Sequence, residues 1–240
     1  HLMVLGAFVC WTMIELGIPP WVSVLIACGA SYLVGLLIER LVMRPLIGQP
    51  LVGAMMATLA LGILVYGITM LIWSGYTRDF ATPIFPAGGI SFGPARTSGS
   101  LVGAFAVAIV VFAGLVIFFQ RSATGLAMRA TAEGHLLAQA TGIKVTKVFG
   151  VTWALAGAVG ALGGICLSDR IALGVTETAV IAFKVFPVIL LGGLESIPGA
   201  LVAGLIIGLA ETLSGGYIST LFAQIVPYII LLIVLMGRSE

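Results

Sequence analysis

Charged side chains are scarce in this sequence. Only 8% of its 240 residues are Asp, Glu, Lys or Arg, whereas soluble domains average roughly 25%. A surface exposed to water cannot be assembled from so few charges, so the class of water-soluble globular proteins is excluded. The 11 Lys and Arg residues are scattered, and nucleic-acid binding would need them clustered on one face. We therefore expect no nucleic-acid partner.

Residues that bind metals or nucleotides are also few. The three cysteines, Cys10, Cys28 and Cys166, each lie within an apolar run, and their odd number and unrelated spacings argue against disulfides or a metal site. No His, Cys or carboxylate pair has metal-ligand spacing. The phosphate-binding pattern G-x-x-x-x-G-K-[ST] does not occur. The sequence predicts no metal, no cofactor and no ATP-binding loop of its own.

Long apolar runs are what the sequence has instead, with 60% hydrophobic residues and a mean hydropathy of +1.23. Hydrocarbon about 30 Å thick is crossed by about 20 helical residues. The runs are apolar on every side, unlike alternating barrel strands, and in lipid each helix pairs its own backbone groups. We predict an all-α, polytopic transmembrane bundle of about seven or eight spanning or partly spanning helices, at residues 2–14, 16–38, 51–73, 101–119, 148–167, 179–193, 199–210 and 221–236. The short first run and the start at His1 indicate a missing N-terminal part.

The basic residues predict an orientation. Residues 39–50, residues 121–147 and the C-terminal tail fall on one side of the membrane and carry Arg40, Arg44, Arg121, Arg129, Lys144, Lys147 and Arg238. The opposite side carries Arg78, Arg96 and Arg170. Because Lys and Arg favour the cytoplasm, we expect the first set, including the C-terminus, to be cytoplasmic. Residues 1–240 are interpreted as one transmembrane domain.

The cytoplasmic loop at residues 121–147 is predicted to hold a short helix. Ala130, Glu133, Leu137 and Ala140 recur at helical spacing, and Gly142 stands where a glycine ends a helix. This predicts a helix over residues 131–141, with Gly134 inside it at a cost of roughly 1 kcal/mol. Its alanine-rich face suits docking in a groove on another protein better than binding to a membrane. The alternative is a loop that only connects, which these residues alone favour slightly.

The same loop carries a resemblance to a known family. The stretch from Arg129-Ala-Thr-Ala-Glu133 through Ala138 to Gly142-Ile143 resembles the coupling loop of permeases of branched-chain amino acid ABC importers. Residues 39–46 are similar to that family's first cytoplasmic loop, and residues 191–200 to its Gly-Gly…Ser-x-Pro-Gly-Ala turn. The chain departs from the family at Gly134, usually acidic, at Glu195, usually small, and in lacking the N-terminal helix.

The resemblance implies a bacterial-type inner-membrane permease subunit that moves branched-chain or related amino acids by ATP-driven alternating access. It implies as partners two ATP-binding cassette subunits, which would hydrolyse the ATP, a second permease subunit and a solute-binding protein. The residues expected to couple to the ATPase are Arg129, Ala132, Glu133, Ala138, Gly142 and Ile143. Relatives in this family are linked to urea, amides and small carboxylates, and no pattern in the sequence separates these solutes.

Two charges interrupt apolar segments, Lys184 and Glu211. Charges at membrane depth are costly and usually face a cavity or a partner, so both could line a translocation path as a pair. Alternatively both lie near an interface and extend to the headgroups. For Glu211 the sequence does not choose, and for Lys184 it favours the second interpretation. A different class of function, an ion-coupled carrier or channel without an ATPase, would use these two residues.

Glycine patterns give three further predictions. Gly160 with Gly164 and Gly204 with Gly208 mark faces for close helix packing, within the chain in preference to between subunits. The break at residues 192–199 is either a plain cytoplasmic turn, which the parity of the spans favours, or a gap in a broken helix. Residues 89–93 fit the nucleophile pattern G-x-S-x-G by chance, because they lie in an outer loop and His135 on the opposite side.

Overall fold

The structure is a computed structural model that describes residues 1–47, 51–80, 84–85, 88–92, 95–169, 172–175, 183–193 and 196–237. It divides into two compact units. Unit 1 comprises His1–Val111 and Ile117–Ala179, and unit 2 comprises Phe112–Val116 and Val180–Glu240. That residues 1–240 form one domain stays a prediction.

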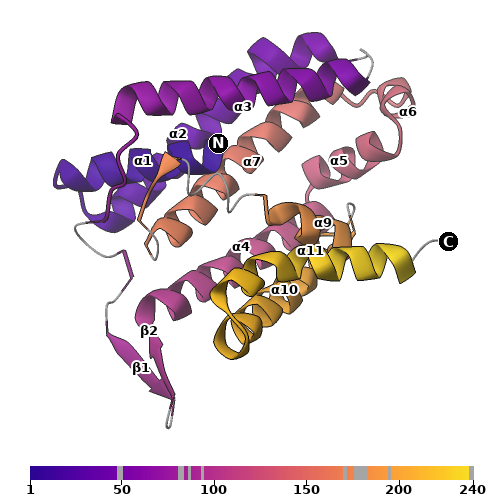
Figure 1. The fold of residues 1–240 in the computed structure, drawn as a ribbon. Coiled ribbons are helices and arrows are strands. Elements are labelled where there is room, and N and C mark those ends of the chain that lie inside the picture. Colours follow the sequence, from indigo (N-terminus) through magenta and orange to yellow (C-terminus); the bar gives the residue numbers. More distant parts are fainter. Residues whose placement is uncertain are drawn as a thin grey trace. The chain divides into compact units, whose positions relative to one another are not determined.

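Helices make up most of both units (Figure 1). In unit 1 they are α1 (Leu2–Glu15), α2 (Pro20–Ile38), the π-helical η1 (Glu39–Met43), the 3-10 turn η2 (Arg44–Leu46), α3 (Leu51–Trp73), α4 (Gly99–Arg121), α5 (Ala123–Glu133), α6 (His135–Ala140) and α7 (Val145–Ser168). The middle residues of α4 are assigned to unit 2, which also holds α9 (Val185–Gly192), α10 (Ile197–Tyr217) and α11 (Thr220–Gly237).

Five helical segments of the described residues are long and apolar enough to cross a membrane: Pro20–Leu46, Val52–Trp73, Gly99–Arg121, Val145–Ser168 and Ile197–Tyr217. The helices α1 and α11 are apolar but shorter, and α9 has 8 residues. The predicted all-α, polytopic fold is confirmed. Five long helices with three shorter ones account for the predicted seven or eight segments.

The core of unit 1 is the packing of α1, α2 and α7 (Figure 1). The helices approach through glycines, because a β-carbon at Gly35 would overlap the carbonyl oxygen of Trp153, and one at Gly157 that of Ser31. In lipid no hydrophobic force draws helices together, so such close backbone contact supplies the dispersion energy of association. Around these crossings Val4, Phe8 and Ile165 are almost fully buried.

One end of unit 1 is closed by polar contacts. The indole of Trp73 donates a hydrogen bond to Thr12 Oγ1 over 2.8 Å. The Arg78 guanidinium lies 4.9 Å from the centre of the Trp11 ring. At the end of α7, Asp169 accepts hydrogen bonds from the Ile84 N–H, over 3.1 Å, and from the Ser100 hydroxyl, over 2.5 Å. These contacts hold the loop after α3 and the start of α4 against the end of α7.

This end also carries a feature that the sequence interpretation missed. The expected outer loop forms an antiparallel hairpin of β1 (Gly89–Phe92) and β2 (Ala95–Ser98), with Gly89 opposite Ser98 and Phe92 opposite Ala95. The residues of the G-x-S-x-G pattern therefore begin a strand that is followed by another strand. A nucleophile elbow requires a strand followed by a helix.

Unit 2 is built on a tight turn between α9 and α10. A β-carbon at Gly192 would lie 2.6 Å from the backbone nitrogen of Ala200, so only glycine allows this approach. Ser196 caps the N-terminus of α10, and its hydroxyl accepts a hydrogen bond from the Gly199 N–H over 3.0 Å. The helix continues to Tyr217, well beyond the predicted end at residue 210. The predicted segment at residues 179–193 falls partly outside the described residues.

Candidate functional site

The loop at residues 121–147 folds as two helices and not as the predicted single helix over residues 131–141. The first, α5, starts early because the hydroxyl of Ser122 accepts a hydrogen bond from the Gly125 N–H over 2.8 Å. It ends at Gly134, whose backbone is extended at φ −178° and ψ 112°. Glycine loses more conformational entropy in a helix than any other residue, so the helix breaks there and restarts as α6. We call α5, Gly134 and α6 the elbow.

The end of the elbow follows the predicted glycine stop. Gly142 has φ +87°, in the left-handed region. The N–H of Ile143 donates to the carbonyl of Ala138 and the N–H of Gly142 to that of Gln139, both over 3.0 Å. These two bonds are the Schellman motif, which satisfies the last carbonyls of a helix. The elbow is thereby joined to α7 by a short, defined turn.

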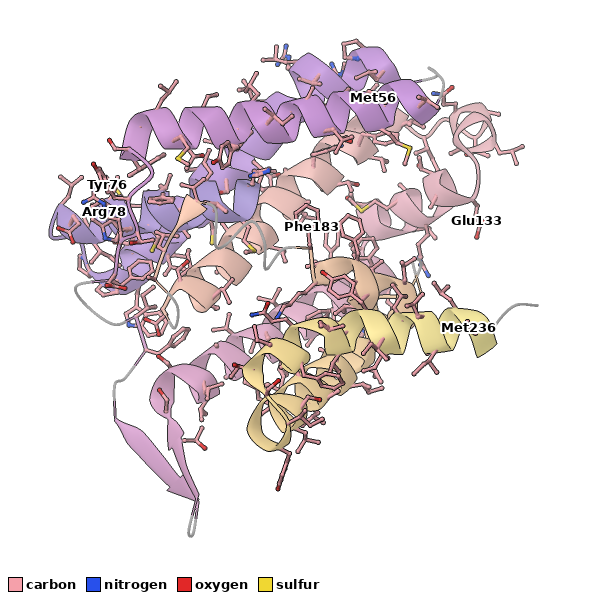
Figure 2. All side chains as sticks on the ribbon, in the orientation of Figure 1. Met56, Tyr76, Arg78, Glu133, Phe183 and Met236 are labelled. Carbon is pink, nitrogen blue, oxygen red and sulfur yellow. The ribbon has the colours of Figure 1, made fainter. Side chains whose placement is uncertain are left out.

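The elbow has an anchored face and an exposed face. Gly125, Met128, Thr131 and Ala138 are buried, and both α5 and α6 pack on α7. The exposed face carries Arg129, Ala132 and Glu133, together with two large apolar side chains, Leu126 (61% exposed) and Leu137 (76% exposed). Glu133 projects outward from the end of α5 (Figure 2). Of the six predicted coupling residues, Arg129, Ala132, Glu133 and Gly142 are exposed, Ile143 is half-buried and Ala138 is buried.

A buried carboxylate lies at the same end of unit 1. Glu39 is only 3% exposed, and its Oε1 lies 3.5 Å from Nε of Arg44. Gly150 of α7 lies beside it, and a β-carbon there would make an ordinary contact with Oε2 at 3.6 Å. We call this the basic end of unit 1, defined by Arg40, Arg44, Arg121, Arg129, Lys144 and Lys147. The sequence interpretation did not foresee the burial of Glu39, since a carboxylate beside two arginines is usually exposed.

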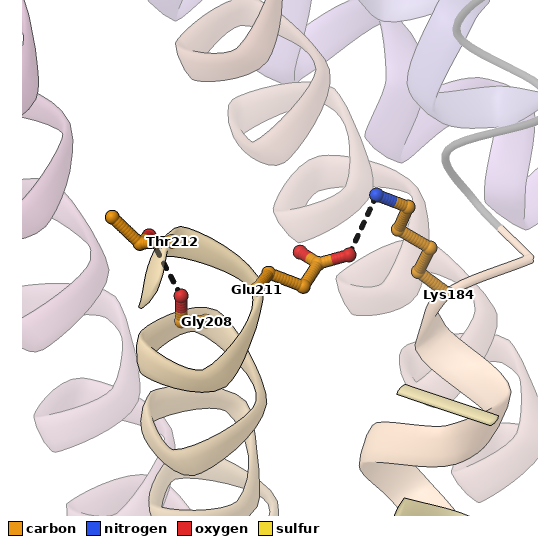
Figure 3. Close-up of polar contacts among 4 residues, drawn as sticks. All are labelled: Lys184, Gly208, Glu211 and Thr212. Atoms are coloured by element: carbon orange, nitrogen blue, oxygen red, sulfur yellow. Dashed lines mark hydrogen bonds and ion pairs between the residues drawn. The ribbon is translucent and has the colours of Figure 1, made fainter. Parts of the chain in front are cut away.

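The two interrupting charges of unit 2 are brought together. The ammonium of Lys184, just before α9, donates a hydrogen bond over 2.7 Å to Oε1 of Glu211 on α10 (Figure 3). Their side chains are 32% and 25% exposed. A lysine that extended to the headgroups would point its ammonium away from the apolar segment, and this one points at Glu211. The geometry therefore favours the pairing over the alternative in which each charge reaches an interface alone.

The predicted small-residue faces lie in different surroundings. A β-carbon at Gly164 would overlap the carbonyl oxygen of Met3, so this glycine serves packing within the chain, while Gly160 lies nearby. Gly204 lies against Val188 of α9, at 3.7 Å from its nearest methyl. A β-carbon at Gly208 would meet nothing within 4 Å. Space is therefore open on α10 one turn before Glu211.

Few other features of the described residues could bind a ligand. A hollow of about 370 Å³ beside the turn between α9 and α10 is lined by apolar side chains and glycine only. No group of three His, Cys, Asp or Glu residues in the described ranges could hold a metal ion. The polar features that remain are the elbow, the basic end and the Lys184–Glu211 pair. Together with the apolar helices they indicate a multi-pass membrane protein with a polar two-helix element at the basic end.

Comparison with known proteins identifies the family. Residues 1–235 match the family model described as the branched-chain amino acid transport system permease component, and the chain belongs to this family. It is 30% identical to the high-affinity branched-chain amino acid transport system permease protein LivH of Salmonella typhimurium and to that of Escherichia coli, over 100% of this chain and 79% of each relative. It is 28% identical to BraD of Pseudomonas aeruginosa, over 89% of this chain and 72% of the relative. No solved structure matches. The chain is a multi-pass inner-membrane transport component.

Proposed function

We propose that this chain is the membrane-spanning subunit of an ABC importer for branched-chain or related amino acids, and that it moves them by ATP-driven alternating access. The names of its relatives support this substrate class. The proposed partners are two ATP-binding cassette subunits, a second permease subunit, identical or homologous, and a solute-binding protein. ATP is hydrolysed on the ATPase subunits and not on this chain.

The observation that carries this proposal is the elbow. A connecting loop needs no exposed leucines, whereas Leu126 is 61% and Leu137 is 76% exposed. Apolar groups surrounded by charges are typical of a surface that another protein covers. The face with Arg129, Ala132 and Glu133 is then the dock for the ATPase.

The anchored face explains how a force on this dock reaches the spans. Met128 and Thr131 of α5 are buried, α5 packs on α7, and α6 is joined to α7 through the Schellman turn. A displaced elbow must therefore move the start of α7. Since α7 packs on α1 and α2 through glycines, those helices move with it.

The proposal places the basic end in the cytoplasm, where the ATPase subunits are. Lys and Arg favour that side, and six of them gather at this end. Because successive spans alternate in direction, the proposal also puts the C-terminus in the cytoplasm.

The test is L-leucine uptake into proteoliposomes that contain this chain with its ATPase, permease and binding-protein partners. Uptake is expected only when ATP is present on the side of the membrane where the ATPase subunits lie and the binding protein is present on the opposite side. Leucine uptake without either component would contradict the proposal.

A matched pair of variants tests the dock itself. Ala132→Arg adds a large charged side chain to the exposed face and is expected to abolish copurification of the ATPase. Thr146→Arg adds the same side chain at an exposed position of α7, outside the elbow. It is expected to leave copurification intact. Equal loss in both variants would show that an added charge at this end, and not the docking face, caused the loss.

One observation favours a second candidate function. The Lys184–Glu211 pair is the kind of intramembrane charge pair that ion-coupled carriers use. If the chain is such a carrier, the chain alone will accumulate solute when a proton or sodium gradient is imposed, with no ATPase present.

A further inference from the structure

The Lys184–Glu211 pair lies deep in the span that α10 forms. The 21 residues of α10 extend about 31 Å at 1.5 Å per residue, which matches a hydrocarbon core of roughly 30 Å. Along this helix, Glu211 lies about 21 Å from the start at Ile197 and about 9 Å from the end at Tyr217. If α10 spans the hydrocarbon core, the α-carbon of Glu211 is therefore about 6 Å from the midpoint of the span and about 9 Å from the nearer surface.

The pair is accessible in spite of its depth. A quarter of the Glu211 side chain and about a third of Lys184 are exposed. Charges that face hydrocarbon carry a large desolvation cost, so intramembrane charges face the interior of a bundle or a water-filled path. The open side of this pair is therefore expected to face the interior of the assembled bundle or a water-filled path.

The chemistry of the pair matches the main chain of an amino acid. A zwitterionic α-amino acid carries one ammonium and one carboxylate, and moving both into an apolar path without partners is costly. The pair offers an ammonium and a carboxylate of its own, joined at 2.7 Å. If the substrate carboxylate pairs with Lys184 and the substrate ammonium pairs with Glu211, the net charge of the site stays at zero and each of the four charges keeps a hydrogen-bonded partner.

We propose that Lys184 and Glu211 form a transient binding site for the main-chain charges of an amino acid in transit. The substrate carboxylate accepts hydrogen bonds from Nζ of Lys184, and the substrate ammonium donates to the carboxylate of Glu211. This inference rests on the proposed function, because it takes the cargo to be an amino acid. Gly208 lies one turn before Glu211 on α10 (Figure 3), and a β-carbon there would meet nothing within 4 Å, so no described residue of this chain fills the space next to it.

The competing explanation is that the pair only ties α9 to α10. The charge-reversed variant Lys184→Glu/Glu211→Lys separates the two explanations because it keeps an ion pair. A structural tie works in either direction. A binding site does not, since reversal turns the bound amino acid around and directs its side chain to a different place.

The experiment measures initial L-leucine uptake by the complete assembly in proteoliposomes, with the thermal melting temperature of each variant in detergent. Glu211→Gln is expected to lower uptake on the order of 10- to 100-fold, the contribution of a hydrogen bond to a charged group. The reversed pair is expected to stay comparably low while its melting temperature stays near that of the unmodified chain. Glu15→Gln makes the same chemical change at an exposed residue at the end of α1 and is expected to leave uptake unchanged.

Wild-type uptake by the reversed pair would overturn the inference and leave a structural tie, and so would wild-type uptake by Glu211→Gln. If Glu211→Gln does not assemble, the reversed pair decides alone. If the unmodified assembly takes up no leucine, the proposed function fails, and this inference fails with it before any variant is compared.

Discussion

Single glycines determine how closely the helices of unit 1 approach. We predict that Gly157→Ala lowers the free energy of unfolding by about 1–3 kcal/mol, because its methyl group would overlap the Ser31 backbone, which cannot move without separating α2 from α7. Gly163→Ala, on the same helix, meets nothing within 4 Å and gains helix propensity. The melting temperature in detergent measures both variants. A drop of equal size in Gly163→Ala would show that glycine is needed in α7 for another reason.

The carboxylate of Glu39 depends on a single arginine. We predict that Arg44→Gln destabilises the chain by about 1–2 kcal/mol, because it leaves a buried carboxylate without its counter-charge, while the half-exposed position of Arg44 limits the loss. Arg40→Gln removes the same charge from an exposed neighbour and is expected to change stability by less than about 0.5 kcal/mol. Chemical denaturation in detergent compares the two, and equal effects would assign the loss to charge alone.

At this scale the sequence predicted which residues are unusual, and it offered the pairing of Lys184 with Glu211 only as one of two alternatives. Lys184 and Glu211 were recognisable as charges in apolar segments, since any charge in such a segment is costly. Their pairing depends on the tight turn at Gly192 and Gly199, which sets α9 alongside α10. The contacts of Asp169 with Ile84 and Ser100 join positions far apart in the chain, and no local pattern records them.

Among the elements, the elbow depends most on its last residue. We predict that Gly142→Ala costs about 1–2 kcal/mol locally, because alanine is disfavoured at φ +87° and the Schellman turn would open. Gly134→Ala is the control outside the turn, since its backbone is extended, its β-carbon would make an ordinary contact at 3.6 Å with Leu137, and any gain in helix propensity acts on the junction of α5 and α6 and not on Gly142. Trypsin cleavage after the exposed Lys144 is expected to accelerate in Gly142→Ala only. Unchanged cleavage in that variant would mean that the turn does not hold the elbow.

The spans were predictable as elements, and their ends were not. Residues 51–73 were predicted with the same bounds as α3. A long apolar run is stable only in lipid, and a helix is the structure that pairs all of its backbone groups there. The predicted segment ended at residue 210 because the charge of Glu211 lowers the hydropathy there. The helix itself continues through Glu211 to Tyr217. The break at Gly134 was misjudged for a similar reason. Glu133 and Leu137 are spaced four residues apart, as in a helix, but this spacing carries no information about Gly134 between them, where the helix is interrupted.

At the scale of the whole molecule, apolar side chains cover the surface. Leu71 of α3 and Tyr217 of α10 are more than 80% exposed, and large exposed hydrophobic residues continue along α2, α3, α10 and α11. No soluble protein could keep such a surface. The bilayer and the second permease subunit that we propose would share it, and the composition alone predicted that a solvent other than water covers it.

The topology of the molecule gives the last prediction, because alternating spans connect the orientation of both units. If the basic end is cytoplasmic, a cysteine at the exposed Gln139 is reached from inside only, and one at the exposed Tyr76 from outside. In unit 2, a turn between α9 and α10 on the inside places Ser219 outside. Single-cysteine variants, with Cys10, Cys28 and Cys166 replaced by alanine, are labelled with a membrane-impermeant maleimide on intact cells. Tyr76→Cys and Ser219→Cys are expected to react, and Gln139→Cys only after the cells are opened. Labelling of Gln139→Cys on intact cells would invert the proposed orientation and remove the elbow from the reach of a cytoplasmic ATPase.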